Sequence, residues 1–271
     1  MRLAVVGTGL IGSSFALGAR RAGVFESVVG IEPDAGRADR ALTLGVIDAV
    51  ADDVPADVDA VLLAGPSHTI ADWVVLLTDH PGILFDAGSV KAPVLAAARR
   101  SGGLPRRFVP CHPLAGSERS GPDAARPDLF ADAEVIVTPA PETDREALVA
   151  VAGWWQALGA RVTEMGAEDH DRVLAVTSHL PHLVAFAYLQ QITDEHRPHT
   201  AGGFRDFTRI GAADADMWTP IFQLNREAVL TALDELERSL GEARDLLGAG
   251  DADGLAAFIR RAAARRGGTD D

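Results

Sequence analysis

The histidine at position 112 is the side chain of this sequence that is best suited to proton transfer. It lies in the segment CHPLAGSERSG (111–121), which can form neither a long helix nor a long strand. An imidazole titrates near neutral pH and can accept a proton from a hydroxyl group. Pro113 stiffens the backbone beside it, and Gly116 permits a sharp turn further on. We therefore predict that His112 is a catalytic base; the alternative is a solvated surface loop that happens to contain a histidine.

Other polar groups follow predicted strands in the same way. The segment GPSH (65–68) comes after one such strand and DAGSVK (86–91) after another. Ligands of an open parallel sheet bind outside the carboxyl ends of its strands. Ser89 fits a catalytic role and a plain helix N-cap equally well, and His68 is most simply a loop histidine near the ligand. We interpret Cys111 as a small buried hydrophobe, because nothing else indicates covalent chemistry.

Three glycines near the N-terminus predict a phosphate-binding turn. Gly7, Gly9 and Gly12 form a GxGxxG pattern in VVGTGLIG (5–12), directly after a strand-like run. The first glycine allows a tight turn, the second a close approach of backbone to a pyrophosphate, and the third helix packing on the strand. Leu10 and Ile11 open the following helix, whose free N–H groups attract phosphate. A merely structural turn is the alternative.

An acidic residue at the end of the second predicted strand indicates which dinucleotide is bound. Glu32 lies 20 positions after the last of the three glycines. A carboxylate there accepts hydrogen bonds from ribose hydroxyls and repels a 2′-phosphate, which favours NAD over NADP. Arg37 and Arg40 on the next helix could weaken that preference. Pro66, after the third strong strand, is predicted to border the same cofactor.

Two arginines in GGFRDFTR (202–209) could bind an anionic substrate. Arg205 and Arg209 lie four positions apart after a glycine turn, so a helix would present both guanidinium groups on one face. Such groups bind carboxylates through paired hydrogen bonds. The alternative is a surface helix in which one arginine pairs with Asp206 or Asp214.

Two further histidines, His179 and His182, lie three positions apart in SHLPH (178–182). This spacing could hold a metal ion on one helix face. No third ligand is evident on the same element, so we predict no metal site.

The elements that must position these groups alternate over the first 165 residues. Runs typical of strands occupy residues 3–7, 27–32, 60–65, 82–87, 107–113, 134–139 and 160–165, and helical patterns separate the earlier ones. Alternation of this kind predicts βαβ units with right-handed crossovers. The fold class is therefore α/β, with a Rossmann-type, doubly wound, mostly parallel sheet in a domain covering residues 1–165.

The pattern changes to helices alone in the remaining residues, 166–271. Residues 167–192 predict one long helix, which Pro181 should kink. Residues 225–247 place apolar side chains at alternating spacings of four and three: Val229, Leu233, Leu236, Leu240, Ala243 and Leu247. The stripe fits a core-facing helix slightly better than a dimer seam.

Composition restricts the partners. Of the 271 residues, 47% are hydrophobic and 24% are charged, which is typical of a globular protein. No apolar run approaches membrane-spanning length, and the single cysteine and absence of a signal peptide indicate a cytoplasmic protein. The net charge of −14 argues against nucleic acid and anionic membranes as partners. A small anionic substrate remains open, because a local arginine cluster can override the overall charge.

Taken together, these segments resemble the prephenate/arogenate dehydrogenase family of tyrosine biosynthesis. The resemblance spans residues 3 to about 218 and rests on order and spacing. It is carried by VVGTGLIGSSFA, the strand ending in Glu32, DAGSVK, HPLAGSERSG with a downstream DLF, TSHLPHLVAFA, and GGFRDFTRIGAADADMW.

The resemblance implies a Rossmann-type domain, an all-α domain that forms a homodimer, and an active site between them. His112 matches the catalytic histidine and Ser89 the serine near the substrate's ring hydroxyl. Arg209 matches the substrate-carboxylate arginine and His182 a pocket residue. The implied substrate-binding set also includes Ser117 of HPLAGSERSG and Arg205, whose role is less defined because some members have lysine there.

The implied function is NAD-dependent oxidative decarboxylation of prephenate to 4-hydroxyphenylpyruvate. Arogenate, or a 4-amino-4-deoxy analogue of prephenate, would fit the same residues. More distant alternatives are a 3-hydroxyacid-type NAD(P) dehydrogenase, disfavoured because Lys91 is the only lysine and lies in the first domain, and a non-catalytic nucleotide sensor. We expect no added chorismate mutase or ACT segment.

Overall fold

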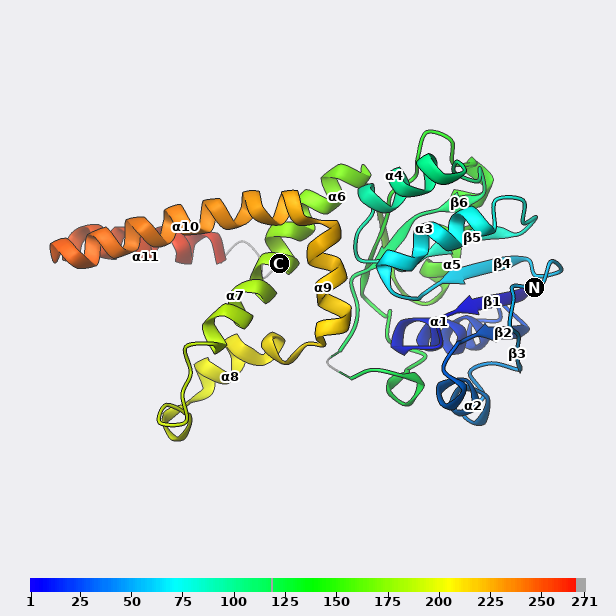
Figure 1. Cartoon of the computed structure of the whole chain (residues 1–271), viewed down its shortest axis with the longest axis horizontal. Coiled ribbons are helices and arrows are strands. Elements are labelled where there is room, and N and C mark those ends of the chain that lie inside the picture. Colours follow the sequence, from blue (N-terminus) through cyan, green and yellow to red (C-terminus); the bar gives the residue numbers. More distant parts are fainter. Residues whose placement is uncertain (118, 267–271) are drawn as a thin grey trace. The chain divides into compact units, whose positions relative to one another are not determined.

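The computed structural model of this chain describes residues 1–117 and 119–266. Its contacts divide the chain into two compact units, Met1–Asn225 and a second unit that begins at Arg226 (Figure 1). Each unit is described separately below. The division near residue 165 that the sequence indicates remains a prediction.

A six-stranded parallel sheet forms the centre of the first unit, in the order β3-β2-β1-β4-β5-β6. Its strands are β1 (Arg2–Val6), β2 (Ser27–Ile31), β3 (Ala49–Val50), β4 (Ala60–Leu63), β5 (Ile83–Asp86) and β6 (Phe108–Val109). The order reverses between β1 and β4, as in a doubly wound dinucleotide-binding sheet. The predicted fold class is confirmed.

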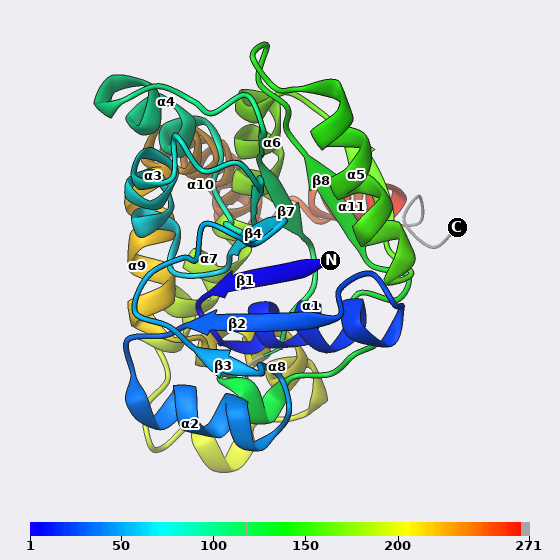
Figure 2. The same ribbon diagram turned by 90° about the vertical axis from the view of Figure 1, so that its right-hand side faces the viewer.

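Helices cover both faces of this sheet because alternate strand residues are apolar on both sides (Figure 2). In β1, Leu3 and Val5 pack with α1 and α5, whereas Ala4 and Val6 pack with α3 and α4. The helices of this part are α1 (Leu10–Arg21), α2 (Ala35–Thr43), α3 (Ser67–Leu76), α4 (Ala92–Ser101) and α5 (Arg145–Ala157). The carboxyl ends of the strands therefore remain open for a ligand.

A second sheet corrects one prediction from the sequence. The run 107–113, predicted as one strand, is divided at Pro110 between β6 and β7 (Cys111–Pro113). β7 pairs antiparallel with β8 (Glu134–Val137), and β8 pairs parallel with β9 (Arg161–Glu164). Proline has no N–H for the ladder, so the strand breaks there and His112 enters a different sheet.

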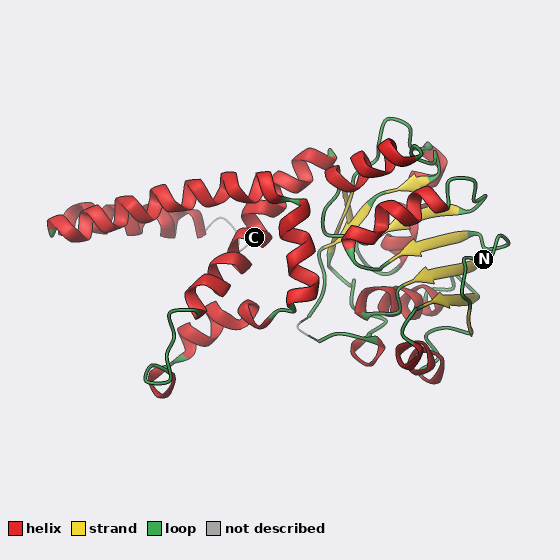
Figure 3. Cartoon of the chain, in the orientation of Figure 1, coloured by secondary structure: helices red, strands yellow, loops and turns green. Residues whose placement is uncertain are grey.

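Only helices follow β9 within the described residues (Figure 3). The predicted helix over 167–192 is α6 (Ala167–Leu174), a π-helical turn (Ala175–His179) and α7 (Leu180–Leu189). Pro181 cannot donate a backbone hydrogen bond to the preceding turn, and the widened turn lies immediately before it. The first unit ends with α8 (Gly202–Thr208), a 3₁₀ turn (Arg209–Ala212) and α9 (Ala215–Leu224).

The second unit is a pair of helices, α10 (Arg226–Ala249) and α11 (Ala252–Arg266), joined by an ion pair between Arg261 and Glu242. The apolar stripe predicted on the first of them begins at the buried Val229, but Leu240 and Leu247 are 59% and 65% exposed. The stripe is therefore not core-facing along its whole length in the single chain. None of the described helices is both long and apolar enough to cross a membrane.

Candidate active site

The turn between β1 and α1 has the geometry that the three glycines predict. Gly7 has a φ of 94°, and a side chain there would place its Cβ 2.9 Å from the Ala64 backbone. A Cβ on Gly12 would lie 2.2 Å from the Gly7 carbonyl oxygen, whereas one on Gly9 would meet open space. No side chain caps α1, so its first N–H groups remain available. The turn therefore fits a dinucleotide pyrophosphate.

Glu32 lies just after β2 and faces this turn. Its carboxylate accepts hydrogen bonds from Thr8 N at 2.9 Å, Thr8 Oγ1 at 3.1 Å and Asp34 N at 3.2 Å, and Arg37 lies 3.3 Å away. Arg40 turns instead to Asp123, at 2.7 Å from its Nε. The acidic group is thus fixed beside the β1–α1 turn.

The other residues predicted to bind the cofactor lie close to the same turn in the structure. Leu10 and Ile11 form the partly buried first turn of α1. Pro66 is exposed and lies before α3, on the segment after β4 that also adjoins Gly7.

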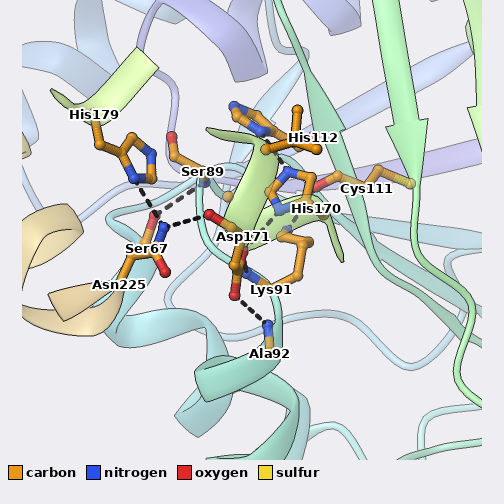
Figure 4. A network of polar contacts seen from close by, with 12 residues as sticks. Ser67, Ser89, Lys91, Ala92, Cys111, His112, His170, Asp171, His179 and Asn225 are labelled. Atoms are coloured by element: carbon orange, nitrogen blue, oxygen red, sulfur yellow. Dashed lines mark hydrogen bonds and ion pairs between the residues drawn. The ribbon is translucent and has the colours of Figure 1, made fainter. Parts of the chain in front are cut away.

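His112 is connected to two residues that the sequence did not single out. Its Nδ1 lies 2.9 Å from His170 Nε2, and His170 Nδ1 lies 2.8 Å from Asp171 Oδ1 (Figure 4). Both partners belong to α6, and His170 is fully buried. The imidazole of His112 is therefore held on one side only, since no other hydrogen bond to it is found in the described part of the chain.

The environment keeps His112 in its neutral form. Burial, followed by the neighbouring His170, Lys91 and His179, lowers the pKa of His112 well below its ordinary value. A neutral imidazole is the form that can accept a proton. The site is thus electrostatically suited to a base.

Asp86, the last residue of β5, and Lys91 together hold the backbone of Cys111, the residue before His112. The Asp86 carboxylate accepts hydrogen bonds from Cys111 N at 2.8 Å and Gly88 N at 3.0 Å, and it pairs with the Lys91 ammonium. Lys91 Nζ also donates to the Cys111 carbonyl at 2.7 Å. Both charged groups are 1% exposed. Cys111 is buried as predicted, and burial raises the pKa of its thiol.

The start of α4 is capped from a distant segment. Asp171 accepts hydrogen bonds from Lys91 N at 2.9 Å and Ala92 N at 2.8 Å. The N-cap position is occupied by Lys91, so Ser89 is not the cap of this helix. Ser89 is partly buried, and its backbone N–H donates to Ser67 Oγ at 3.2 Å. The plain-cap interpretation of Ser89 is therefore wrong, and its side chain lies in the same cluster as His112 (Figure 4).

The two other histidines have separate partners. His179 Nδ1 lies 3.0 Å from Asn225 Nδ2, and burial lowers the pKa of His179 to about 4. His182 stacks on Trp218 with ring centroids 3.7 Å apart, and burial lowers its pKa, an effect to which Arg209 also contributes. Trp218 in turn packs with Val90, beside Ser89. These contacts connect His182 of α7 to the segment that follows β5.

The predicted substrate arginines are exposed. Arg205 lies on α8 and Arg209 opens the 3₁₀ turn that follows it. Neither guanidinium forms an ion pair among the described residues, so the alternative of pairing with Asp206 or Asp214 is not observed. Ser117 is exposed, and its Oγ accepts a hydrogen bond from the backbone N–H of Arg119 at 3.1 Å. The structure thus brings Arg209 near His182, whereas no hydrogen bond between Ser117 and a histidine is found among the described residues.

The fold and the site together define a dinucleotide-binding oxidoreductase. A family model described as the nucleotide-binding domain of prephenate dehydrogenase matches residues 15–164, and one described as its dimerization domain matches residues 166–261. The chain belongs to the prephenate dehydrogenase family.

Named relatives agree with this assignment. The chain is 35% identical to a cyclohexadienyl dehydrogenase of Zymomonas mobilis (93% of this chain and 90% of the relative) and 34% identical to a prephenate dehydrogenase of Bacillus subtilis (97% and 75%). Among solved structures, it is similar to a prephenate dehydrogenase from A. aeolicus in complex with hydroxyphenyl propionate and NAD+. That likeness has a TM-score of 0.92 and 32% identity, over 100% of this chain and 98% of the other.

Proposed function

We propose that this chain catalyses the oxidative decarboxylation of prephenate to 4-hydroxyphenylpyruvate, with NAD as its cofactor. The observation that carries the proposal is His112: a neutral imidazole near the carboxyl ends of β5 and β6, in a chain whose β1–α1 turn fits a dinucleotide. The names of the relatives and the NAD+ in the A. aeolicus complex support the choice of substrate and cofactor.

The residues act by positioning and by one proton transfer. Prephenate carries a ring hydroxyl and, para to it, a quaternary carbon that bears a carboxylate. Bound NAD supplies the hydride acceptor. His112 takes the hydroxyl proton, a hydride leaves the carbon that bears this hydroxyl, and the bond to the ring carboxylate breaks with loss of CO2, so that the ring becomes aromatic. Ser89 orients the hydroxyl. Aromatisation drives the reaction, so a rigid base is the main requirement.

The direct test is NAD+ reduction by the purified protein with prephenate and with arogenate in parallel. We expect turnover of prephenate, and 4-hydroxyphenylpyruvate as the product. Turnover of arogenate alone would move the substrate to the amino form, which a likeness to Synechocystis arogenate dehydrogenase (TM-score 0.81, 26% identity) makes worth including. Reduction with neither compound would refute the proposed reaction.

The preference for NAD over NADP should depend on the negative charge of Glu32. The wild-type protein is expected to use NAD with higher kcat/KM than NADP. Glu32→Gln should narrow that preference by roughly tenfold or more, because a charge-assisted hydrogen bond is worth about 1.5–3 kcal/mol. Steady-state kinetics with both cofactors measures the ratio, and Glu26→Gln, an exposed carboxylate before β2, is the control. Equal use of both cofactors by the wild type would contradict the assignment to NAD.

Arg209 is proposed to hold a substrate carboxylate. Arg209→Ala should raise the KM for prephenate while kcat changes little, since one charge-assisted interaction of about 1.5–3 kcal/mol is lost. Arg197→Ala is the matched control, because Arg197 is also exposed but pairs with Asp194. If KM is unchanged in the first variant, the carboxylate is bound elsewhere. The same comparison of KM for alanine variants of Arg205 and Ser117 would measure how much each of them contributes to substrate binding.

We also propose that the chain acts as a homodimer. The matching family model is described as a dimerization domain, and the exposed leucines of α10 offer an apolar surface for a second copy. The substrate-pocket role of His182 fits this arrangement, since it lies on the helical segment that the same model covers.

A further inference from the structure

We propose that His170 and Asp171 are positioning residues that fix His112 with its proton on Nδ1, so that Nε2 is the atom that receives the substrate's proton. The inference rests on the proposed function for the reaction itself. The tautomer of His112, however, is a property of the protein alone and can be measured without any substrate.

Asp171 is held in place from three sides. Oδ1 accepts a hydrogen bond from Lys91 N and Oδ2 one from Ala92 N, at the start of α4. Its backbone carbonyl accepts a further hydrogen bond from Asn225 Nδ2 at 2.8 Å. Backbone N–H groups can only donate, so both carboxylate oxygens are used as acceptors.

The direction of the next two hydrogen bonds follows. His170 Nδ1 lies 2.8 Å from Asp171 Oδ1, so this nitrogen carries the proton. A neutral imidazole protonated on Nδ1 has a bare Nε2, which can only accept. His112 Nδ1 lies 2.9 Å from that atom and must therefore donate. The remaining nitrogen of His112, Nε2, is left unprotonated.

This arrangement prepares His112 for the charge that it acquires. In the proposed reaction the substrate O–H bond breaks and its proton forms a bond with Nε2, while the carbon that bears this oxygen would give up its hydride to the nicotinamide of the cofactor. His112 then carries a positive charge, which the hydrogen bonds through His170 to the Asp171 carboxylate stabilise. The side chains of His170, Lys91 and His179 all lower the pKa of His112 and so oppose that charge, whereas Asp86 already pairs with Lys91. The hydrogen bonds that lead through His170 to the Asp171 carboxylate are therefore the interaction that stabilises the charged form on this side of the His112 ring.

The tautomer is tested by ¹⁵N NMR of the full chain labelled on its histidine rings, with NAD present and above neutral pH. His112→Asn identifies the signals of His112 by their disappearance. We expect a protonated Nδ1 and a bare Nε2. A proton on Nε2 of His112 would overturn the inference, whatever the activity of the protein. Failure of prephenate turnover would instead overturn only the proposed function.

Two substitutions at His170 test the positioning role. His170→Gln keeps an oxygen acceptor close to the position of Nε2, whereas His170→Met keeps the bulk but no comparable acceptor. We expect His170→Met to lower kcat roughly tenfold or more, as part of the contribution of an oriented base, with prephenate KM within about threefold of wild type. His170→Gln should recover most of kcat. His199→Met, at an exposed histidine, is the control.

The split between kcat and KM separates positioning from general damage to the fold. Unchanged kcat in His170→Met, or no recovery in His170→Gln, would overturn the role. If the methionine variant does not fold, the NMR measurement on the wild type still decides the tautomer, and the glutamine variant alone is compared with wild type: a large loss of kcat there would count against the proposal.

Discussion

Replacing His112 by asparagine is expected to lower kcat by roughly 10²–10⁴-fold, the range for loss of a general base. The amide nitrogen of asparagine approximates the position of Nδ1, so the variant can still donate to His170 and keep the site packed. What it lacks is Nε2. KM for prephenate should therefore change little, and steady-state kinetics with NAD measures both constants.

The pH dependence of the wild-type protein gives an independent check on the same residue. The pKa of His112 is lowered, so the neutral base persists as the pH falls through the ordinary range of histidine titration. The kcat/KM of the free enzyme should therefore decrease on the acid side only at pH values below that ordinary range. Near-wild-type kcat in His112→Asn, or an acid limb above the usual histidine pKa, would remove His112 from the role of base.

The second large effect is expected on stability, at Lys91. Lys91→Met removes one partner of a buried ion pair and leaves the Asp86 carboxylate uncompensated. Loss of one partner in this way typically costs about 3–5 kcal/mol of the free energy of unfolding. It also releases the Cys111 carbonyl, to which Lys91 Nζ donates at 2.7 Å. Denaturant unfolding monitored by tryptophan fluorescence measures the change.

Two further variants test whether the lost stability comes from the buried ion pair. Arg99→Met, on the same helix, breaks an exposed pair with Glu142 and should cost less than about 1 kcal/mol. Adding Asp86→Asn to Lys91→Met removes the unpaired charge and should recover part of the stability. A cost at Lys91 no greater than that at Arg99 would show that the buried pair does not hold the β5–α4 turn.

Local signals were sufficient to predict most of the sheet. Four of its strands are apolar runs bounded by glycine or charged residues: β1, β2, β4 and β5. Such continuous apolar runs are typical of parallel strands that are buried on both faces. The break at Pro110 is hard to predict because the residues directly before it, Phe108 and Val109, are strong strand formers. Its proline was the available signal, since a missing N–H interrupts a ladder.

The site was predictable only where a single side chain or a short motif defines its own chemistry. The glycine turn and His112 are of this kind. His170 and Asp171 are not: His170 lies 58 positions after His112, and AEDHD reads as an ordinary acidic first turn of a helix. Lys91 was noticed only as the sole lysine. Its burial with Asp86 depends on tertiary packing, which local sequence does not encode.

The capping of α4 by Asp171 makes one catalytic group depend on two distant stretches of chain. A protein cut after residue 165 would retain β7 and His112 but lose the carboxylate that holds the first N–H groups of α4 and the imidazole that orients its base. Such a fragment could still present the glycine turn to a nucleotide. On the proposed function, we therefore expect cofactor binding and catalysis to be separable in this chain, so that a fragment that binds the nucleotide would not catalyse the reaction.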